Sequence, residues 1–160
     1  MEELSPDLLR QLEVVVAGSQ SELGAALRAF PRTSEWLQII GAFDGDQRGK
    51  INEAGMRWPH CFLPGQASPE ETFRDCLQQA GSIEMLSQEL GVRRQDLVMA
   101  LDATTGLEPH DWLVELGQRL AMSRQALVRS FVRIWLETNR AEGEQFIEEL
   151  AARYDAQGPD

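Results

Sequence analysis

Two aspartates, Asp44 and Asp46, are the residues of this chain whose type and spacing best suit chemistry. They directly follow an apolar run at residues 36–43, and only Gly45 separates them. In an extended segment, side chains at i and i+2 point to the same side, so both carboxylates would face one point. Two converging carboxylates repel each other unless a cation lies between them. Because oxygen ligands favour Mg²⁺ or Mn²⁺, the pattern predicts a divalent metal site.

The same residues suggest two other interpretations. The first stays open, and the second fails because metal ligands are missing. Asp44 and Asp46 could instead belong to a polar turn in which aspartates cap backbone amides. The stretch also resembles half of a calcium-binding EF-hand loop. That resemblance fails because Arg48 stands at the fifth loop position and Gly55 stands where a bidentate glutamate is needed.

The elements that must position these aspartates alternate between strand and helix. Residues 12–17 form a short, valine-rich run that is typical of a strand buried in a parallel sheet. Ser19 followed by Glu22 predicts a capped helix that Pro31 ends. Residues 36–43 predict a second strand, and residues 61–63 a third short one. The order strand, helix, strand predicts a parallel sheet with a right-handed crossover.

The rest of the chain carries helix signals only. Ser68 and Pro69 predict a helix start, and apolar residues spaced by three and four continue to Tyr154. We therefore predict an α/β protein, α+β overall: a small, incomplete parallel sheet layer at 1–66, an all-helical region at 67–155 and a disordered tail at 156–160. We expect no internal repeat longer than a helix-turn unit.

Two stretches of the helical region, residues 82–101 and 112–136, each resemble a helix-turn-helix. A DNA-reading helix pair should carry a basic stripe. Residues 67–160 hold seventeen acids against nine bases. This balance favours ordinary core helices, with Trp112, Phe131 and Trp135 in the core rather than stacked on bases.

Charge and composition limit the possible partners. The 160 residues contain 26 acids and 15 Lys and Arg, a net charge of −11. Since nucleic-acid affinity depends on neutralising phosphates, this chain alone should bind DNA only weakly, through metal ions or a partner. The sequence has no signal pattern, no membrane-spanning apolar run and no zinc-like Cys spacing, so we expect a cytoplasmic protein without membrane contact.

Several segments in order resemble a known family of nucleases. The stretch from Ile39 through Asp44-Gly45-Asp46-Gln47-Arg48 resembles the Asp-x-Asp motif of topoisomerase-primase (Toprim) domains. More narrowly, it looks like the Toprim nuclease domain of ATP-dependent nucleases of the OLD ("overcoming lysogenization defect") family. The supporting segments, together covering roughly residues 12–150, are Val14-Val15-Val16-Ala17-Gly18-Ser19, Phe62-Leu63-Pro64-Gly65, Ser68-Pro69-Glu70 and His110-Asp111-Trp112.

The resemblance implies a reaction and the residues that perform it. It implies Mg²⁺- or Mn²⁺-dependent hydrolysis of DNA phosphodiesters, typically with two ions about 3.5–4 Å apart. Asp44, Asp46 and Glu70 would be the catalytic and metal-binding carboxylates, and Arg48 a phosphate contact. Glu70 could equally be a helix N-terminal acid favoured by the helix dipole.

One part of the family pattern is missing. Toprim catalysis uses a glutamate in a Glu-Gly setting at the end of an earlier strand, whereas the first run here ends in Ala17-Gly18. The chain also has no Gly-x-x-x-x-Gly-Lys-Ser/Thr ATPase signature. It therefore looks like the later part of a Toprim nuclease domain, as a fragment, a split subunit or a degenerate relative, which would act with an ATPase domain or subunit.

A second class of function is a catalytically silent interaction module. Such a module would keep the Toprim-like sheet and dock an ATPase subunit or a second copy of itself. The acidic segment near Glu142 and Glu148 would be a solvated face or would meet a basic partner.

Overall fold

The structure, a computed structural model, describes residues 10, 12–32 and 37–156, which cluster into two compact units. The first unit takes Met1–Ala67 together with Ala141–Asp160, and the second takes Ser68–Arg140. The sequence boundary after residue 66 lies next to the observed one, but the last part of the chain groups with the first unit. The tail at 156–160 lies, except for Ala156, outside the described residues.

The first unit contains the mixed α/β part of the fold. Its elements are α2 (Gln20–Ala29), β1 (Gly41–Phe43), the 3₁₀ turn η1 (Gly45–Gln47) and β2 (His60–Phe62). The helix starts as predicted: Ser19 Oγ accepts the Glu22 amide, while the Ser19 amide donates back to the Glu22 carboxylate at 2.6 Å. The hydrogen bonds that the Ser19 amide and hydroxyl donate to the Glu22 carboxylate lower the pKa of Glu22. A local capping signal was therefore sufficient to place α2.

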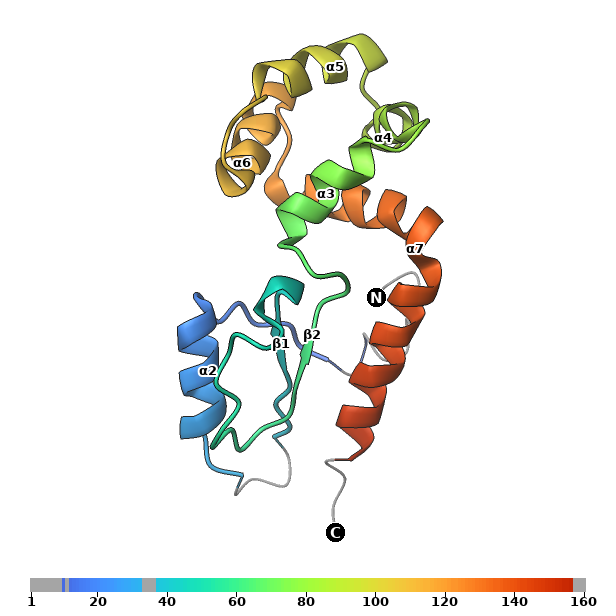
Figure 1. The fold of residues 1–160 in the computed structure, drawn as a ribbon. Coiled ribbons are helices and arrows are strands. Elements are labelled where there is room, and N and C mark those ends of the chain that lie inside the picture. The colour runs from blue at the N-terminus through green and yellow to red at the C-terminus, as the bar shows by residue number, and fades with distance from the viewer. Residues whose placement is uncertain (1–9, 11, 33–36, 157–160) are drawn as a thin grey trace. The chain divides into compact units, whose positions relative to one another are not determined.

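The two strands form a parallel pair with α2 against β1 (Figure 1). In their register Gly41 lies opposite His60 and Phe43 opposite Phe62. Gly41 allows this packing because a Cβ there would come within 2.5 Å of Leu27. The core of the unit consists of Leu27, Phe43, Trp58 and Phe62, with Leu23, Ile39, Ile51 and Met56 against it. The predicted α/β class with parallel strands is confirmed.

Two strand predictions are wrong in part. Residues 12–17 form no strand, and Val14, Val15 and Val16 are 75%, 75% and 90% exposed. Residues 37–40 have no regular structure, so the predicted run at 36–43 pairs only at its end; residue 36 lies outside the described residues. An apolar run becomes a strand only where another strand satisfies its backbone groups and covers its faces. In the described residues, only β1 and β2 provide that for each other.

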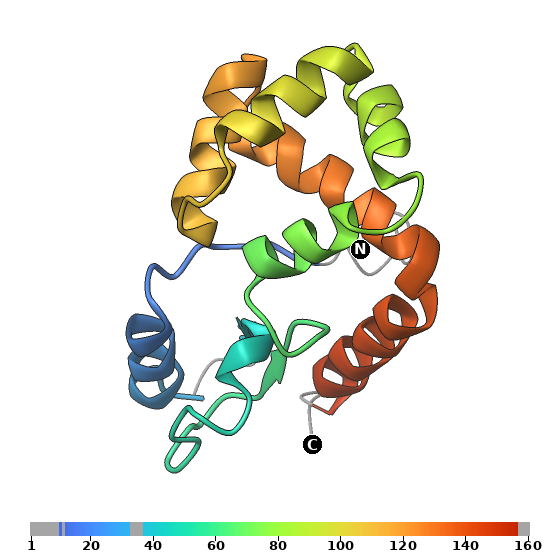
Figure 2. The same ribbon diagram turned by 45° about the horizontal axis from the view of Figure 1, so that its top comes forward.

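The second unit is helical, as predicted for this region. Its helices are α3 (Pro69–Leu77), α4 (Ser82–Leu90), α5 (Arg94–Ala103), α6 (Pro109–Leu120) and the first part of α7 (Arg124–Asp155) (Figures 1 and 2). Ser68 and Glu71 form a second capping box at the start of α3. The long helix α7 departs from helical geometry at Asn139 (φ −122°, ψ 30°), next to the boundary between the units.

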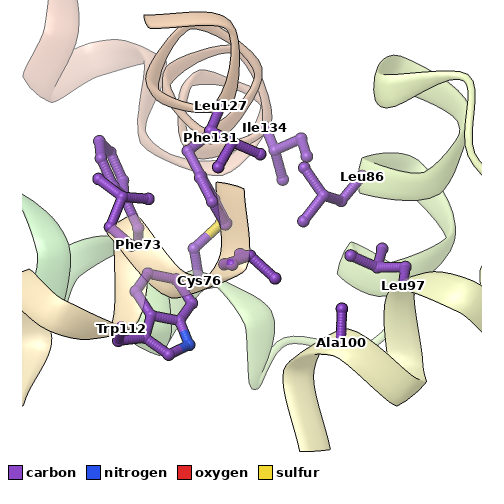
Figure 3. Packing of buried hydrophobic residues seen from close by; sticks show 11 residues of the cluster. Phe73, Cys76, Leu86, Leu97, Ala100, Trp112, Leu127, Phe131 and Ile134 are labelled. Atoms are coloured by element: carbon purple, nitrogen blue, oxygen red, sulfur yellow. The ribbon is translucent and has the colours of Figure 1, made fainter. Parts of the chain in front are cut away.

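One apolar cluster holds these helices together (Figure 3). Phe131 is fully buried and stacks on Phe73 with ring centroids 5.1 Å apart, and Trp112 lies 5.6 Å from Phe131. Of the three aromatic residues predicted to lie in the core, Trp112 and Phe131 are buried, and Trp135 is partly buried and packs against the cluster. Within the described residues, no helix is long and apolar enough to cross a membrane.

Candidate functional site

Asp44 lies directly beyond the carboxyl end of β1, at the sheet edge where parallel strands commonly present ligand-binding residues. Its backbone is extended (φ −62°, ψ 149°) and it precedes η1, but its side chain does not cap that turn. Instead, Asp44 Oδ2 accepts a hydrogen bond from Gln20 Nε2 at 2.7 Å. The first turn of α2 therefore orients this carboxylate, which is not the backbone-capping aspartate of an ordinary polar turn.

Asp46 is held by side chains as well. Its Oδ2 accepts hydrogen bonds from Gln47 Nε2 at 2.7 Å and from Lys50 Nζ at 3.2 Å. Lys50 is the only lysine of the chain, and its side chain is 64% exposed. A positive charge is thus already drawn to the Asp46 carboxylate, although an exposed ammonium can leave at little cost.

The extended geometry behind the predicted convergence ends at Asp44. Asp46 lies inside η1, where three residues complete a turn, so its side chain does not follow the i, i+2 rule of a strand. The prediction that residues 44–46 continue the extended strand was wrong, because Gly45 and Asp46 begin a 3₁₀ turn immediately after the short strand.

Gly45 brings the Asp-Gly-Asp turn against the Leu-Pro-Gly segment that follows β2. A Cβ at Gly45 would lie 2.5 Å from the Gly65 carbonyl oxygen and 3.0 Å from that of Leu63. The Leu63 amide also donates to the Phe43 carbonyl at 2.8 Å, which continues the pairing of the strands. Two segments that are separate in sequence therefore form one surface at the carboxyl end of the sheet.

Arg48, the predicted phosphate contact, lies at the same edge. It is exposed, and its guanidinium carbon is 4.9 Å from the centroid of the Phe62 ring. A guanidinium over an aromatic face keeps its hydrogen-bond donors available at the ring's periphery. Arg48 can therefore meet an anion beside Asp46 without first breaking an ion pair within the described residues.

Glu70 belongs to the second unit and has its own partners there. It is the second residue of α3, and its side chain is 13% exposed. Its Oε1 accepts a hydrogen bond from Arg124 at 2.9 Å and lies 3.7 Å from His110 Nδ1. This environment explains an acid at a helix N-terminus without a metal. A metal-binding role for Glu70 stays a prediction.

The donor set fits one divalent ion better than two. Asp44 and Asp46 supply the hard oxygen ligands that Mg²⁺ and Mn²⁺ favour. In the part of the chain that the structure describes, no group of three or more His, Cys, Asp and Glu side chains could hold a metal ion. Two carboxylates suit one Mg²⁺ that keeps most of its water, while a two-ion site needs further ligands.

Sequence reasoning missed the residues that hold the two aspartates. Gln20 gave no signal beyond its place after the Ser19 cap, because its bond to Asp44 spans 24 residues. Lys50 did carry a signal, as a lone lysine four residues after Asp46.

The two cysteines take no part in this site. Cys61 lies within β2 and is fully buried, and its thiol donates to the Gly41 carbonyl at 3.7 Å. Burial, helped by the charge of Glu149 and opposed by Arg153, raises the pKa of Cys61 to about 11. Burial also raises the pKa of Cys76. Since the thiolate is the reactive form, neither residue suits a nucleophile at neutral pH.

Comparison of the chain with protein-family models, with curated proteins and with solved structures finds no match.

Proposed function

We propose that this chain is the metal-dependent nuclease portion of an OLD-like Toprim system that hydrolyses DNA phosphodiesters together with an ATPase. The observation that carries the proposal is the contact between the Asp44-Gly45-Asp46 turn and the segment ending in Gly65. Both segments resemble that family in sequence. Their meeting at the carboxyl end of a parallel sheet, beside two carboxylates and an arginine, supports a shared site.

Each side chain has a defined task in this proposal. Asp44 and Asp46 hold one Mg²⁺ or Mn²⁺, with Gln20 orienting the first carboxylate and Gln47 the second. Arg48 binds a phosphate oxygen of the DNA backbone. When bound, the ion supplies activation of water and neutralisation of charge at the phosphate.

The proposal includes a requirement for additional protein. Two carboxylates are fewer than a two-ion hydrolytic site uses, so a further acidic residue must come from another chain or segment. An ATPase domain or subunit would also bring the basic surface that a chain of net charge −11 lacks. The isolated 160 residues should therefore bind metal but cut DNA poorly.

Calorimetric titration with MgCl₂ and MnCl₂ tests the metal site. The wild-type chain should bind one ion with millimolar or tighter affinity, and the double variant Asp44→Asn plus Asp46→Asn should lose that binding. The matched control is Asp75→Asn plus Asp102→Asn, which removes the same charge at two other exposed positions. If neither ion binds the wild type, or if the control loses binding equally, the proposal fails.

One observation favours a second candidate, the catalytically silent interaction module. Lys50 already contacts the Asp46 carboxylate at 3.2 Å, as an internal cation would in a site that has lost its metal. Under this alternative, the chain would bind an ATPase partner or a second copy, and the double asparagine variant would leave that assembly unchanged. Sedimentation of the chain with and without the ATPase would measure it.

A further inference from the structure

The helical unit contains an internal repeat. Residues 86–101 and 116–131 align with a constant offset and no gap. The identical pairs are Leu86/Leu116, Gln88/Gln118, Leu90/Leu120, Arg94/Arg124, Gln95/Gln125, Leu97/Leu127 and Val98/Val128. The repeat is longer than the helix-turn unit expected from sequence, and it covers the end of one helix, a turn and the start of the next.

The turn between the two helices has the same backbone geometry in both copies. The turn residue has a left-handed backbone in each, with φ 66° at Gly91 and φ 53° at Ala121. The amide after it reaches back in both, from Val92 to the Ser87 carbonyl at 3.0 Å and from Met122 to that of Gly117 at 2.9 Å. The turns between α4 and α5 and between α6 and α7 therefore share one backbone geometry, of the kind that joins the two helices of a helix-turn-helix.

Burial explains some of the identities and leaves others unexplained. Leu86 and Leu116 are fully buried, as are Leu97 and Leu127, so core packing accounts for these pairs. The pairs Gln88/Gln118, Arg94/Arg124 and Gln95/Gln125 are exposed in both copies. Core packing does not account for these identical polar pairs, because they lie on the solvated surface.

The two copies differ in charge. Residues 86–101 contain two acids and two arginines, whereas residues 116–131 contain no acid and the three arginines Arg119, Arg124 and Arg129. In a chain of net charge −11, this is a concentrated basic segment. A basic stripe along the second helix of a helix-turn-helix is the expected complement of DNA phosphates.

We propose that the second copy, formed by α6 and the first turns of α7, binds duplex DNA. In helix-turn-helix proteins the second helix enters the major groove and its N-terminal residues contact base edges, while the first helix crosses the backbone. Gln125 and Arg129 are exposed on the first turns of α7 and match the groups that read adenine and guanine edges. Arg119, at the end of α6, contacts a phosphate.

The internal ion pairs of this segment permit such a contact. Arg119 pairs with Glu115, Arg124 with Glu70 and, further along α7, Arg133 with Glu89, through arginine side chains that are 42%, 56% and 42% exposed. Exposed pairs contribute little stability, so a phosphate can replace the carboxylate. Within the described residues Arg129 has no ion pair or hydrogen bond, which leaves its guanidinium available. This DNA contact does not depend on the metal site and would offset the acidity of the rest of the chain.

Fluorescence anisotropy of a labelled duplex of mixed sequence tests the proposal. The measurement uses the full chain carrying Asp44→Asn and Asp46→Asn, in EDTA and low salt, so that metal binding and cutting play no part. Adding Gln125→Ala and Arg129→Ala should weaken binding about tenfold or more and reduce the salt dependence by about one counterion. The control, Arg93→Ala plus Gln95→Ala, makes the same change of charge in the first copy and should leave affinity within about twofold.

Three results would overturn the assignment. The duplex could fail to bind at low salt, the control could lose as much affinity as the test variant, or single-stranded DNA could compete as well as duplex. Circular dichroism of each variant verifies that the helices are retained. Because the readout is free of metal, absence of Mg²⁺ binding in the separate titration would reject the proposed nuclease site and leave this DNA contact standing.

Discussion

Gly45 lies so close to Gly65 that a Cβ atom on Gly45 would come within 2.5 Å of the Gly65 carbonyl oxygen. The contact joins the two motif segments of the first unit at the edge of the β1–β2 sheet. It is backbone against backbone, so no flexible side chain can move aside. The identity of residue 45 therefore decides whether Asp44 and Asp46 keep their present setting.

Gly45→Ala should destabilise the protein by about 1–3 kcal/mol, since overpacking against a carbonyl forces the turn apart. The matched substitution Gly24→Ala, inside α2, meets only the end of Arg28 at 3.2 Å and the end of Met56. It should stabilise the helix by up to about 1 kcal/mol. Urea unfolding of both variants measures the two signs, and equal values would show that the Gly45 contact is not tight.

Lys50→Met should strengthen Mg²⁺ binding about two- to fivefold, because the ammonium 3.2 Å from Asp46 competes with the ion for the same oxygen. Lys50→Arg, which keeps the charge, should leave the affinity near that of the wild type. Calorimetric titration measures both. An affinity that is unchanged in Lys50→Met would show that the metal does not use Asp46.

The stability of the first unit should fall at alkaline pH through Cys61. Burial raises the pKa of this thiol from its ordinary 9.0 to about 11, so the folded state holds the proton more tightly than the unfolded state does. The stability from this group is complete below about pH 9 and is lost as the pH rises towards 11. Urea unfolding across this range should show a steeper decline for the wild type than for Cys61→Ala. Parallel curves would contradict the role of this thiol.

The two turns of the repeat should respond oppositely to exchange of glycine and alanine. Ala121 has φ 53°, a conformation that is strained for any residue with a side chain, whereas Gly91 has φ 66° without that strain. Ala121→Gly should therefore stabilise the second unit by about 1 kcal/mol, and Gly91→Ala should destabilise it by a similar amount. Thermal unfolding of each variant checks the pair; changes of the same sign would mean that the two turns are not equivalent.

Much of the helical architecture could be predicted because its signals are local. Ser19 with Glu22 and Ser68 with Glu71 marked the starts of α2 and α3, and both capping boxes are present. These bonds join residues three apart in sequence, so they need no contact with distant parts of the chain. The mixed α/β class was predicted from short apolar runs that each end in a turn. Parallel strands were predicted from the order strand, helix, strand that begins at residue 12, whereas the observed parallel pair is β1 with β2.

The candidate site was only partly predictable. Asp44 and Asp46 stood out by spacing, but the bond from Gln20 to Asp44 and the position of Glu70 beside Arg124 depend on contacts across 24 and 54 residues. The repeat of α4–α5 in α6–α7 was present in the sequence. The left-handed turns at Gly91 and Ala121 show that its two copies also share a backbone conformation at the turn.

Helix starts, the distribution of acidic and basic residues and the two aspartates after an apolar run can all be read from the sequence. Each of these features depends only on neighbours along the chain. Only the tertiary structure decided that Val14–Val16 remain exposed while Phe43 and Phe62 are buried. All five belong to apolar runs. A strand needs hydrogen-bonding and packing partners from elsewhere in the chain, and the two short strands provide these for each other.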